Sequence, residues 1–436
     1  MKSVNPKFDV IVVGSGPGGA SVARELAKQQ QRVLIIEQGR ATPLKGTLGQ
    51  MASMAAIPGR SVYFNQDASL LVSGITAGGS STINYATAMT PPMDLFAKYG
   101  IDLQAALDEL RTEIPMAPLP DDLVGPMATR IMQSALALGL PWHKFDKMIY
   151  PDKCRRGCWR CTYGCPFSAK WTARNFIDEA TAHGAQFVSQ TKVLRVLHHE
   201  QKVMGVLVDG AQGKEEIHAT RVILLAGGIG SARLLHASGL RPRTASHFSD
   251  PVVAVMGSVD DLGDALGGAE VPMVAGMYLP QEGITLADMT LPRAMYQGFA
   301  AQVGRFDRLG AHARTLSVMV KIRDQIGGEI GPHWVNKSLN TSDKNKLNQG
   351  INLARHILES SGAKQIFKSW HFSAHPGGSV RIGEGVDSTL QTNVDGLYVC
   401  DASVIPEAWG LAPSLTLLCL GKRLAKHICE IDMKSN

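Results

Sequence analysis

Four cysteines occur within one short segment, and their thiols are candidates for metal chemistry. They are Cys154, Cys158, Cys161 and Cys165, followed by Pro166, whereas the other three of the chain's 7 cysteines are dispersed in apolar surroundings. The segment is short enough for every thiolate to reach one centre, and four cysteinates are the common ligand set of a 4Fe–4S cluster. We therefore expect these cysteines to hold an iron–sulfur cluster. Zinc and unmetallated structural thiols are the two alternatives.

His375 is the candidate catalytic base. It precedes Pro376, Gly377 and Gly378, a run that fixes a non-helical turn open to a ligand. An imidazole with a pKa near neutrality can take a proton from a ligand bound at such a turn. The chain has 13 histidines, so a structural role is the alternative for any one of them. The glycine turn distinguishes His375 from the others.

A glycine-rich turn near the start of the chain predicts a dinucleotide site. Gly14, Gly16 and Gly19 follow the pattern G-x-G-x-x-G between a buried strand that begins at Phe8 and a helix over residues 18–30. Gly14 permits the turn, Gly16 lets the backbone approach a pyrophosphate, and Gly19 allows close packing of the helix on the strand. The amino terminus of the helix would hold the phosphates with its free N–H groups and positive dipole.

Glu37 is the candidate ribose ligand. It ends a second buried strand over residues 32–37, 18 residues past Gly19. A carboxylate at this place can accept a hydrogen bond from a ribose hydroxyl and would repel a 2′-phosphate, which disfavours NADP. The two strands and the helix form one βαβ unit, and this unit alone does not separate NAD from FAD.

Three later segments resemble the glucose–methanol–choline (GMC) family of flavoprotein oxidoreductases. Residues 74–84 are similar to the second glycine signature of that family, and residues 224–239 to its strand–glycine–helix segment. Its carboxy-terminal pattern is similar to residues 375–383 together with 393–403. The matches bracket most of the chain in family order, at about residues 8–90, 150–240 and 371–430.

The resemblance implies FAD bound in an extended form. The residues implied for the ADP half are Gly14, Gly16, Gly19 and Glu37, with Val193 near the adenine. The residues implied for the flavin region and the remaining contacts are Gly78, Gly79, Ser80, Asn84, Ala226 and Asp401. Asp401 would contact the ribityl or pyrophosphate part. Asp401 directly follows a buried strand, a position where α/β sheets place ligands, and a helix cap is the alternative role for its carboxylate.

The resemblance also places His375 at the position of the family's catalytic base, but one departure follows. The family usually has a second His or Asn downstream, which shares the substrate oxygen with the base. Ala412 stands at that position here, and the side chain of alanine forms no hydrogen bond. The candidates to replace the missing partner are Ser414, His371 and Trp409.

The elements expected to position these residues form an α/β fold. It combines a discontinuous Rossmann-like FAD-binding domain with a smaller α+β substrate domain that has an antiparallel sheet. The FAD-binding domain is expected over residues 1–90, 150–240 and 371–436. A helical cover segment over 91–149 and the substrate domain over 241–370 complete the chain.

Composition excludes several classes of protein. The 436 residues are 44% hydrophobic and 19% charged, which is typical of a soluble globular chain with two domains. The net charge of +6 is too mild and too scattered to predict a nucleic-acid partner. The sequence contains no run of about 18 apolar residues, so no membrane span is predicted. The apolar start is a strand rather than a secretion signal, so we expect a cytoplasmic protein.

We therefore expect an FAD-dependent dehydrogenase that oxidises an alcohol. Methionine-rich stretches are compatible with a hydrophobic substrate, and ordinary core or lid packing is the alternative for these methionines, which are Met51, Met54, Met89, Met93, Met116, Met127 and Met132. Hydride would pass to flavin N5, and electrons would then pass through the cysteine-bound cluster to a carrier. An acidic electron-transfer protein could dock on the basic side chains near the cysteines. These are Lys153, Arg155, Arg156, Arg160 and Lys170. The alternatives are a flavin enzyme acting on a C–C or C=C bond, a redox-relay protein and a non-catalytic paralogue.

Overall fold

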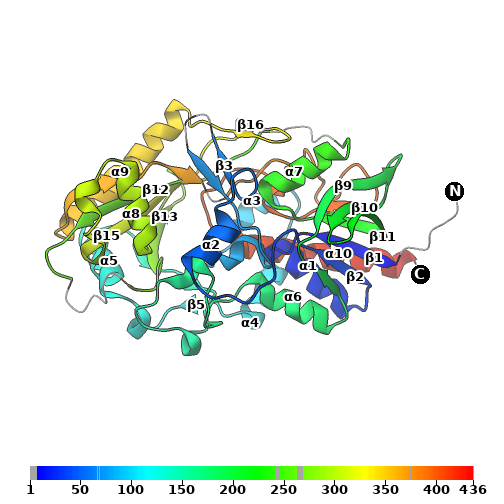
Figure 1. Ribbon diagram of the computed structural model, residues 1–436, viewed down its shortest axis with the longest axis horizontal. Coiled ribbons are helices and arrows are strands. Elements are labelled where there is room, and N and C mark those ends of the chain that lie inside the picture. The colour runs from blue at the N-terminus through cyan, green and yellow to red at the C-terminus, as the bar shows by residue number, and fades with distance from the viewer. Residues whose placement is uncertain are drawn as a thin grey trace.

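Two β-sheets, arranged along the long axis of the molecule, form the framework of the chain (Figure 1). The computed structural model describes residues 7–65, 67, 69–240, 246–262, 269–373 and 375–435. The predicted α/β class is confirmed, with a discontinuous Rossmann-like unit and a second sheet that is almost wholly antiparallel.

The first sheet has the parallel core of a dinucleotide-binding fold. β1 and β2 are almost continuously buried, as expected for strands that are covered on both faces. β11 extends beyond this core into an antiparallel meander with β10 and β9. In spatial order the strands are β8 (Gln186–Val188), β2 (Val33–Ile36), β1 (Phe8–Val13), β11 (Gly213–Leu224), β10 (Lys202–Gly210) and β9 (Lys192–His199). β11 also pairs with β20 (Leu397–Val399).

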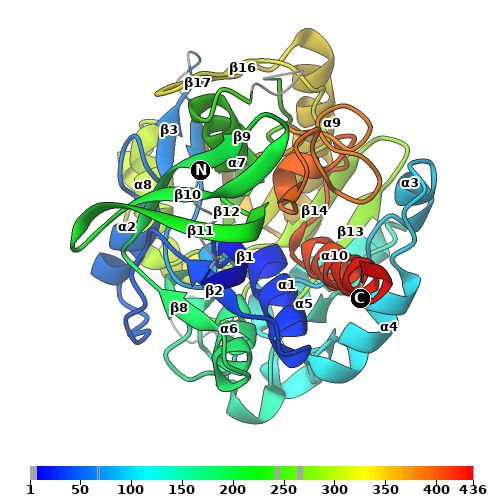
Figure 2. The same cartoon turned by 90° about the vertical axis from the view of Figure 1, so that its right-hand side faces the viewer.

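Helices α1, α6 and α10 pack together on one side of β1 and β2 (Figure 2). α1 begins with Pro17, whose fixed φ suits the first helical position, and it is buried along most of its length between α6 and α10. The helices are α1 (Pro17–Lys28), α2 (Leu48–Ala55), α3 (Met93–Ala97), α4 (Gln104–Glu113), α5 (Pro126–Ala137), α6 (Ala173–Ala182), α7 (Gly227–Ala237), α8 (Arg293–Gln302), α9 (Thr341–Ser360) and α10 (Ser414–Ser435).

The second sheet gathers strands from the middle of the chain and from both sides of it. Its neighbouring strands are antiparallel apart from the pair β4 and β19. In spatial order they are β3 (Val62–Phe64), β4 (Leu70–Val72), β19 (Phe372–Ser373), β12 (Pro251–Ser258), β15 (Thr315–Ile322), β14 (Ile284–Asp288), β13 (Ala275–Leu279) and β6 (His143–Lys144), while β18 (Lys364–Lys368) also pairs with β12.

The two faces of the second sheet have different partners. Leu316 and Val320 on β15 belong to the main buried core, against which α9 packs. α9 comes so close that a Cβ on Gly350 would lie 2.5 Å from Cγ1 of Val320. Met319, on the opposite face, belongs to a second apolar cluster that includes Tyr296 of α8. This second face borders the candidate site.

The shorter elements lie between these layers and at their edges. They are the strand pairs β5 (Ala117–Pro118) with β7 (Asp146–Lys147) and β16 (Glu329–Ile330) with β17 (Val335–Asn336), and the 3₁₀ turns η1 (Gly79–Thr82), η2 (Asp121–Leu123), η3 (Pro151–Lys153), η4 (Arg160–Tyr163), η5 (Phe306–Arg308), η6 (His312–Arg314) and η7 (Ala402–Val404). Within the described ranges, no helix combines the length and apolarity that crossing a bilayer requires. The domain limits drawn from the sequence stay a prediction.

Candidate active site

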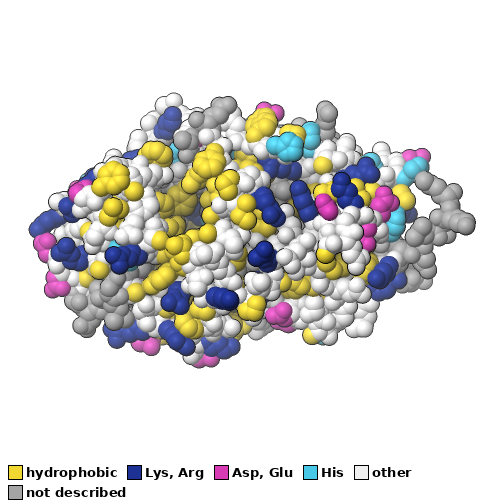
Figure 3. Space-filling model, in the orientation of Figure 1, with side chains coloured by type: hydrophobic (Ala, Val, Ile, Leu, Met, Phe, Trp, Pro, Cys, Tyr) yellow, Lys and Arg dark blue, Asp and Glu magenta, His cyan; other side chains and the backbone are white. Residues whose placement is uncertain are grey.

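A cavity of about 1370 Å³ extends between the two sheets. At one end it meets the carboxyl ends of β1 and β2, where Gly14 and Glu37 line it. At the other end it meets the face of the second sheet that carries Val252 and Met319. Figure 3 shows hydrophobic side chains around a hollow on this side of the molecule, between the β12–β13 region and the β3–α2 region. Most of the residues predicted from the sequence line this cavity.

The first glycine turn has the shape that a pyrophosphate requires. Gly14 has φ +109°, and a Cβ there would lie 2.3 Å from the carbonyl oxygen of Leu225. A Cβ on Gly19 would lie 2.3 Å from the carbonyl oxygen of Gly14. Nothing lies within 4 Å of a Cβ on Gly16, among the described residues, although Gly16 lines the cavity. The outer glycines are therefore required by packing, and the middle one leaves room for a ligand at the start of α1.

Glu37 lines the cavity, but its carboxylate also organises the turn. It accepts hydrogen bonds from the amide of Ser15 (3.1 Å), the hydroxyl of Ser15 (2.6 Å) and the amide of Gly39 (2.7 Å). Burial raises the pKa of Glu37, while these donors act in the opposite direction. A carboxylate oxygen can accept more than one hydrogen bond, so Glu37 can still accept one from a ribose hydroxyl in this arrangement.

Val193 lies at the same end of the cavity as Glu37. The amide of Thr191 donates to the backbone oxygen of Glu37 (3.0 Å), which brings the start of β9 beside the end of β2. Thr191 and Val193 both line the cavity, and so does Ala226 at the amino terminus of α7. Their assignment to the cofactor remains a prediction.

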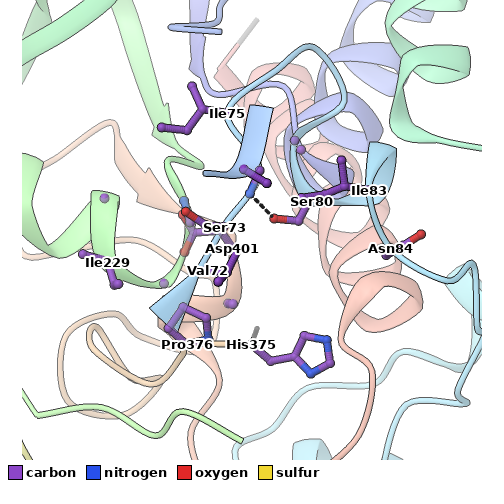
Figure 4. Close-up of a pocket in the computed structure, with 18 of the residues that line it drawn as sticks. Val72, Ser73, Ile75, Ser80, Ile83, Asn84, Ile229, His375, Pro376 and Asp401 are labelled. Carbon is purple, nitrogen blue, oxygen red and sulfur yellow. Dashed lines mark hydrogen bonds between the residues drawn. The ribbon is translucent and has the colours of Figure 1, made fainter. Parts of the chain in front are cut away.

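The second glycine loop packs directly on the first. A Cβ on Gly79 would lie 2.9 Å from Cα of Gly16, so the two loops touch through their backbones. Ser80 lines the cavity, and its hydroxyl accepts a hydrogen bond from the amide of Gly74 (2.9 Å; Figure 4). Gly78, by contrast, is not among the cavity-lining residues: its φ is +82° and its amide donates to the hydroxyl of Ser15 (3.1 Å).

Asn84 and Asp401 line the cavity (Figure 4), and each forms hydrogen bonds to a neighbouring helix. Asn84 Nδ2 donates to the hydroxyl of Ser414 at the start of α10 (3.2 Å). Asp401 Oδ2 accepts from the amide of Gly227 (2.8 Å) and the hydroxyl of Ser231 (2.5 Å), both in α7. Asp401 Oδ1 accepts from an amide of η7, so the capping role considered for this carboxylate is present.

His375 lies where the cofactor part of the cavity meets the second sheet. Two backbone hydrogen bonds join Phe248 and Gly377 (3.0 and 3.1 Å), which fixes the loop after β19 against the strand that leads into β12. His375 keeps 26% of its side-chain surface accessible and lines the cavity. Figure 4 shows its imidazole on the same side of the view as Asn84 and opposite Ile229. Burial, and then the charge of Lys321, lower the pKa of His375 well below its usual value, so the ring is neutral at pH 7.

Asp250 is the carboxylate beside His375. Its Oδ2 lies 3.8 Å from Nδ1 of His375, and its side chain is fully buried. Within the described residues no side chain donates a hydrogen bond to either of its oxygens. Burial raises the pKa of Asp250 well above its usual value, while the charge of Lys321 acts against this shift.

The loop that carries Ala412 forms the opposite wall. Ala412 and Ser414 line the cavity, whereas His371 and Trp409 are not among its lining residues. His371 Nε2 instead lies 3.3 Å from Oδ2 of Asp67. Trp409 is buried, and its ring packs edge-on against a phenylalanine of α3. Of the three replacements considered, only Ser414 shares the cavity with His375.

The part of the cavity on the second sheet is apolar. Met319 and Met289 come from the sheet, and Met295 and Phe299 come from α8, whose Phe299 stacks on Phe372 of β19 (5.5 Å between ring centres). Met51 and Met89, from the methionine-rich stretches of the sequence, also line the cavity. This lining suits an apolar substrate.

The four-cysteine expectation is not supported. In the part of the chain that the structure describes, no group of three or more His, Cys, Asp or Glu side chains gathers to hold a metal ion, and Cys154, Cys158, Cys161 and Cys165 are all free thiols. Burial raises the pKa of Cys154 to about 12 and that of Cys161 to about 11, so both thiols are protonated at neutral pH. The predicted iron–sulfur cluster and the zinc alternative are therefore not supported, and we derive no step through these residues.

A buried lysine organises the cysteine segment instead. Lys170 Nζ donates to the backbone oxygens of Thr82 (2.8 Å), Asn84 (2.9 Å) and Cys161 (2.8 Å). These bonds fasten η4 to the second glycine loop, and Tyr163 of η4 lines the cavity. The segment therefore contributes to the wall of the site through its backbone and aromatic residues.

Two residues of the site were missed in the sequence. Asp250 and Lys321 are separated from His375 by many residues, and only the pairing of β12 with β15 and β19 brings them together. The signal for Lys321 was one charge near the end of an apolar strand, Thr315–Ile322. A charge at a strand end is normally solvent-exposed, so this signal was weak.

Comparison with known proteins identifies the family of the chain. The amino-terminal profile of the GMC oxidoreductases matches residues 8–266, and the carboxy-terminal one matches residues 323–421. The chain is 25% identical to a GMC-type oxidoreductase of Mycobacterium tuberculosis, covering 96% of this chain and 75% of that protein. It is 24% identical to a long-chain-alcohol oxidase of Arabidopsis thaliana, over 98% of this chain and 67% of that protein.

A solved structure has the same fold. The crystal structure of pyridoxine 4-oxidase from Mesorbium loti superposes with a TM-score of 0.77 at 16% identity, covering 97% of this chain and 99% of that one. The two family profiles together span most of the sequence. The chain therefore belongs to the GMC oxidoreductase family and is an FAD-dependent oxidoreductase of the class that acts on CH–OH groups.

Proposed function

We propose that this protein oxidises an apolar alcohol to the corresponding carbonyl compound, with His375 as the base. The observation that carries the proposal is the position of His375, where the cradle for the cofactor meets an apolar chamber. FAD, when bound, accepts the hydride. His375 is neutral at pH 7 and can take the hydroxyl proton, and Asp250 at 3.8 Å can then balance the charge on the ring.

The cofactor would be held by the glycine loops and the acidic residues around them. The residues we assign to it are Gly14, Gly16, Gly19, Glu37, Gly79, Ser80, Asn84, Val193, Ala226 and Asp401. The open space at Gly16 beside the amino terminus of α1 supports this assignment, because a pyrophosphate needs free amides and close backbone approach. Gly78 contributes by shaping its loop through Ser15.

An aliphatic alcohol is the substrate class that the chamber favours. Its walls carry methionines and phenylalanines, which are flexible or flat and adapt to a hydrocarbon chain. The Arabidopsis relative named a long-chain-alcohol oxidase supports the same class. An acidic electron-transfer partner is a separate proposal, resting on the exposed side chains of Lys153, Arg155, Arg156 and Arg160.

The test is anaerobic reduction of the FAD-loaded protein by primary alcohols from ethanol to hexadecanol. We expect bleaching of the flavin absorbance, with the second-order rate rising with chain length. His375→Gln should slow bleaching by about 100- to 10,000-fold, the range of a lost general base. His143→Gln, at an exposed histidine outside the cavity, is the matched control. No bleaching by any alcohol, or full activity of the His375 variant, would contradict the proposal and favour action on a C–C or C=C bond.

A further inference from the structure

Lys321 is a buried ammonium that faces the candidate site. On β15 it pairs with Val252 of β12 on one side and Thr285 of β14 on the other, and all three residues line the cavity. Its side chain is 3% exposed. Among the described residues, no hydrogen bond and no ion pair within 4.0 Å satisfies its Nζ. Burying a charge without a hydrogen-bond or ion-pair partner lowers the stability of the protein, so we expect the ammonium to have a function.

The neighbours of Lys321 are the groups of the proposed reaction. The loop with Ala412 is fastened to the same strands, because the hydroxyl of Thr285 donates to the backbone oxygen of Gly410 (2.9 Å). On its other side, Val252 follows shortly after Asp250, which lies 3.8 Å from His375. Lys321 therefore lies on the strand between the one that follows Asp250 and the one fastened to the Ala412 loop, and its charge acts on both Asp250 and His375.

We propose that Lys321 donates a hydrogen bond to the reacting oxygen of the substrate, in place of the histidine or asparagine absent at position 412. This inference rests on the function proposed above. The hydroxyl proton passes to His375, and the C–H bond breaks as its electron pair leaves as hydride to FAD. The carbon–oxygen double bond forms from the O–H electrons. Lys321 keeps its own protons and stabilises the negative charge that develops on the oxygen.

Burial supports this role because the interior of the protein screens the charge of the ammonium less than water does. Burial lowers the pKa of Lys321 to about 8, and Asp250 opposes this shift, so the ammonium is still the main form at pH 7. In a chamber lined by methionine and phenylalanine, a single donor of this kind also fixes which end of a chain-like substrate reaches His375.

The competing explanation is that Lys321 only neutralises Asp250. The two roles predict different results for Lys321→Met, which preserves the length of the side chain, and for Asp250→Asn/Lys321→Met. We expect the rate of flavin reduction at saturating decanol to fall about 100-fold or more in Lys321→Met, as for a lost oxyanion donor. The double variant should be at least as slow, because it also lacks the carboxylate beside His375, and Lys321→Arg should recover part of the rate. Recovery of the double variant to near the wild-type rate would overturn the inference.

Ligand binding gives a readout that does not depend on turnover. Decanoate presents a charged oxygen to the ammonium, whereas decanamide has the same shape without the charge. We expect decanoate to bind the FAD-loaded protein about tenfold or more tightly than it binds Lys321→Met, as for a lost charged contact, with decanamide unaffected. Lys364→Met, at an exposed lysine, is the matched control. Equal decanoate binding by wild type and Lys321→Met would refute the role of Lys321.

The two proposals fail in different ways. If His375→Gln stops reduction and Lys321→Met does not slow it, the role of Lys321 is wrong and the proposed function stands. If no alcohol reduces the wild-type flavin, the proposed function is wrong, and the decanoate titration alone decides whether Lys321 binds an anionic oxygen.

Discussion

Replacing Gly16 with alanine should remove FAD binding without unfolding the protein. Gly16 has φ −65°, which alanine adopts readily, and no described atom lies within 4 Å of the new Cβ. The free energy of unfolding of the FAD-free protein should therefore stay within about 1 kcal/mol of wild type. Gly14→Ala is different, because its φ is +109° and its Cβ would lie 2.3 Å from Leu225 O. That variant should lose stability without any cofactor.

The effect of Gly16→Ala on affinity follows from the space that the methyl group occupies. It would displace the pyrophosphate from the amides at the start of α1. Loss of one charged hydrogen bond costs about 1.5–3 kcal/mol, which corresponds to about a 10- to 150-fold rise in the dissociation constant of FAD.

The assay is titration of the FAD-free protein with FAD, followed by flavin fluorescence, alongside urea unfolding of the same preparation. Gly49→Ala is the matched control, because Gly49 is an exposed glycine with equally open surroundings, in α2. It should leave FAD binding unchanged. Wild-type FAD affinity in Gly16→Ala, with folding intact, would refute the cradle proposed here.

Three further predictions test other parts of the structure. Because the pKa of His375 lies below its usual value, the base stays deprotonated on mild acidification. On acidification, the ratio kcat/KM should therefore begin to fall only below about pH 6.5, the usual imidazole value, and a loss on acidification that already sets in above pH 7 would contradict the assignment. Lys337 and Asp324 form a buried ion pair (3.1 Å), so Asp324→Asn should lower the free energy of unfolding by about 3–5 kcal/mol in urea, and a loss under 1 kcal/mol would refute this. Cys158→Ser should leave flavin reduction within about twofold of wild type, because this free thiol belongs to no metal group among the described residues; loss of bound iron with activity would restore the cluster.

The cofactor end of the site could be predicted from sequence because its determinants are local. A strand, a glycine turn, a helix and Glu37 follow one another in the chain, so their spacing already specifies the βαβ unit. The prediction that His375 belongs to the site depends on the family resemblance rather than on residue spacing. Gly78 shows the limit of the resemblance, since a glycine in a signature can shape its loop without lining the cavity.

The substrate end could not be predicted because its determinants are distant in the chain. Lys321 and Asp250 meet near His375 only through the register of β12 with β15 and β19, which no local pattern encodes. The cysteine prediction lacks support for a related reason. Close spacing shows that thiols can reach one centre, but the backbone decides whether they do, and Lys170 fixes that backbone through carbonyl oxygens.

The central claim is that the glycine cradle and the imidazole of His375 face a single flavin. A crystal structure of the FAD-loaded protein tests it most directly. We predict pyrophosphate density at Gly16 and a flavin ring whose reactive edge lies within contact of His375. Density for FAD elsewhere, or a flavin ring separated from that imidazole by protein, would contradict the account.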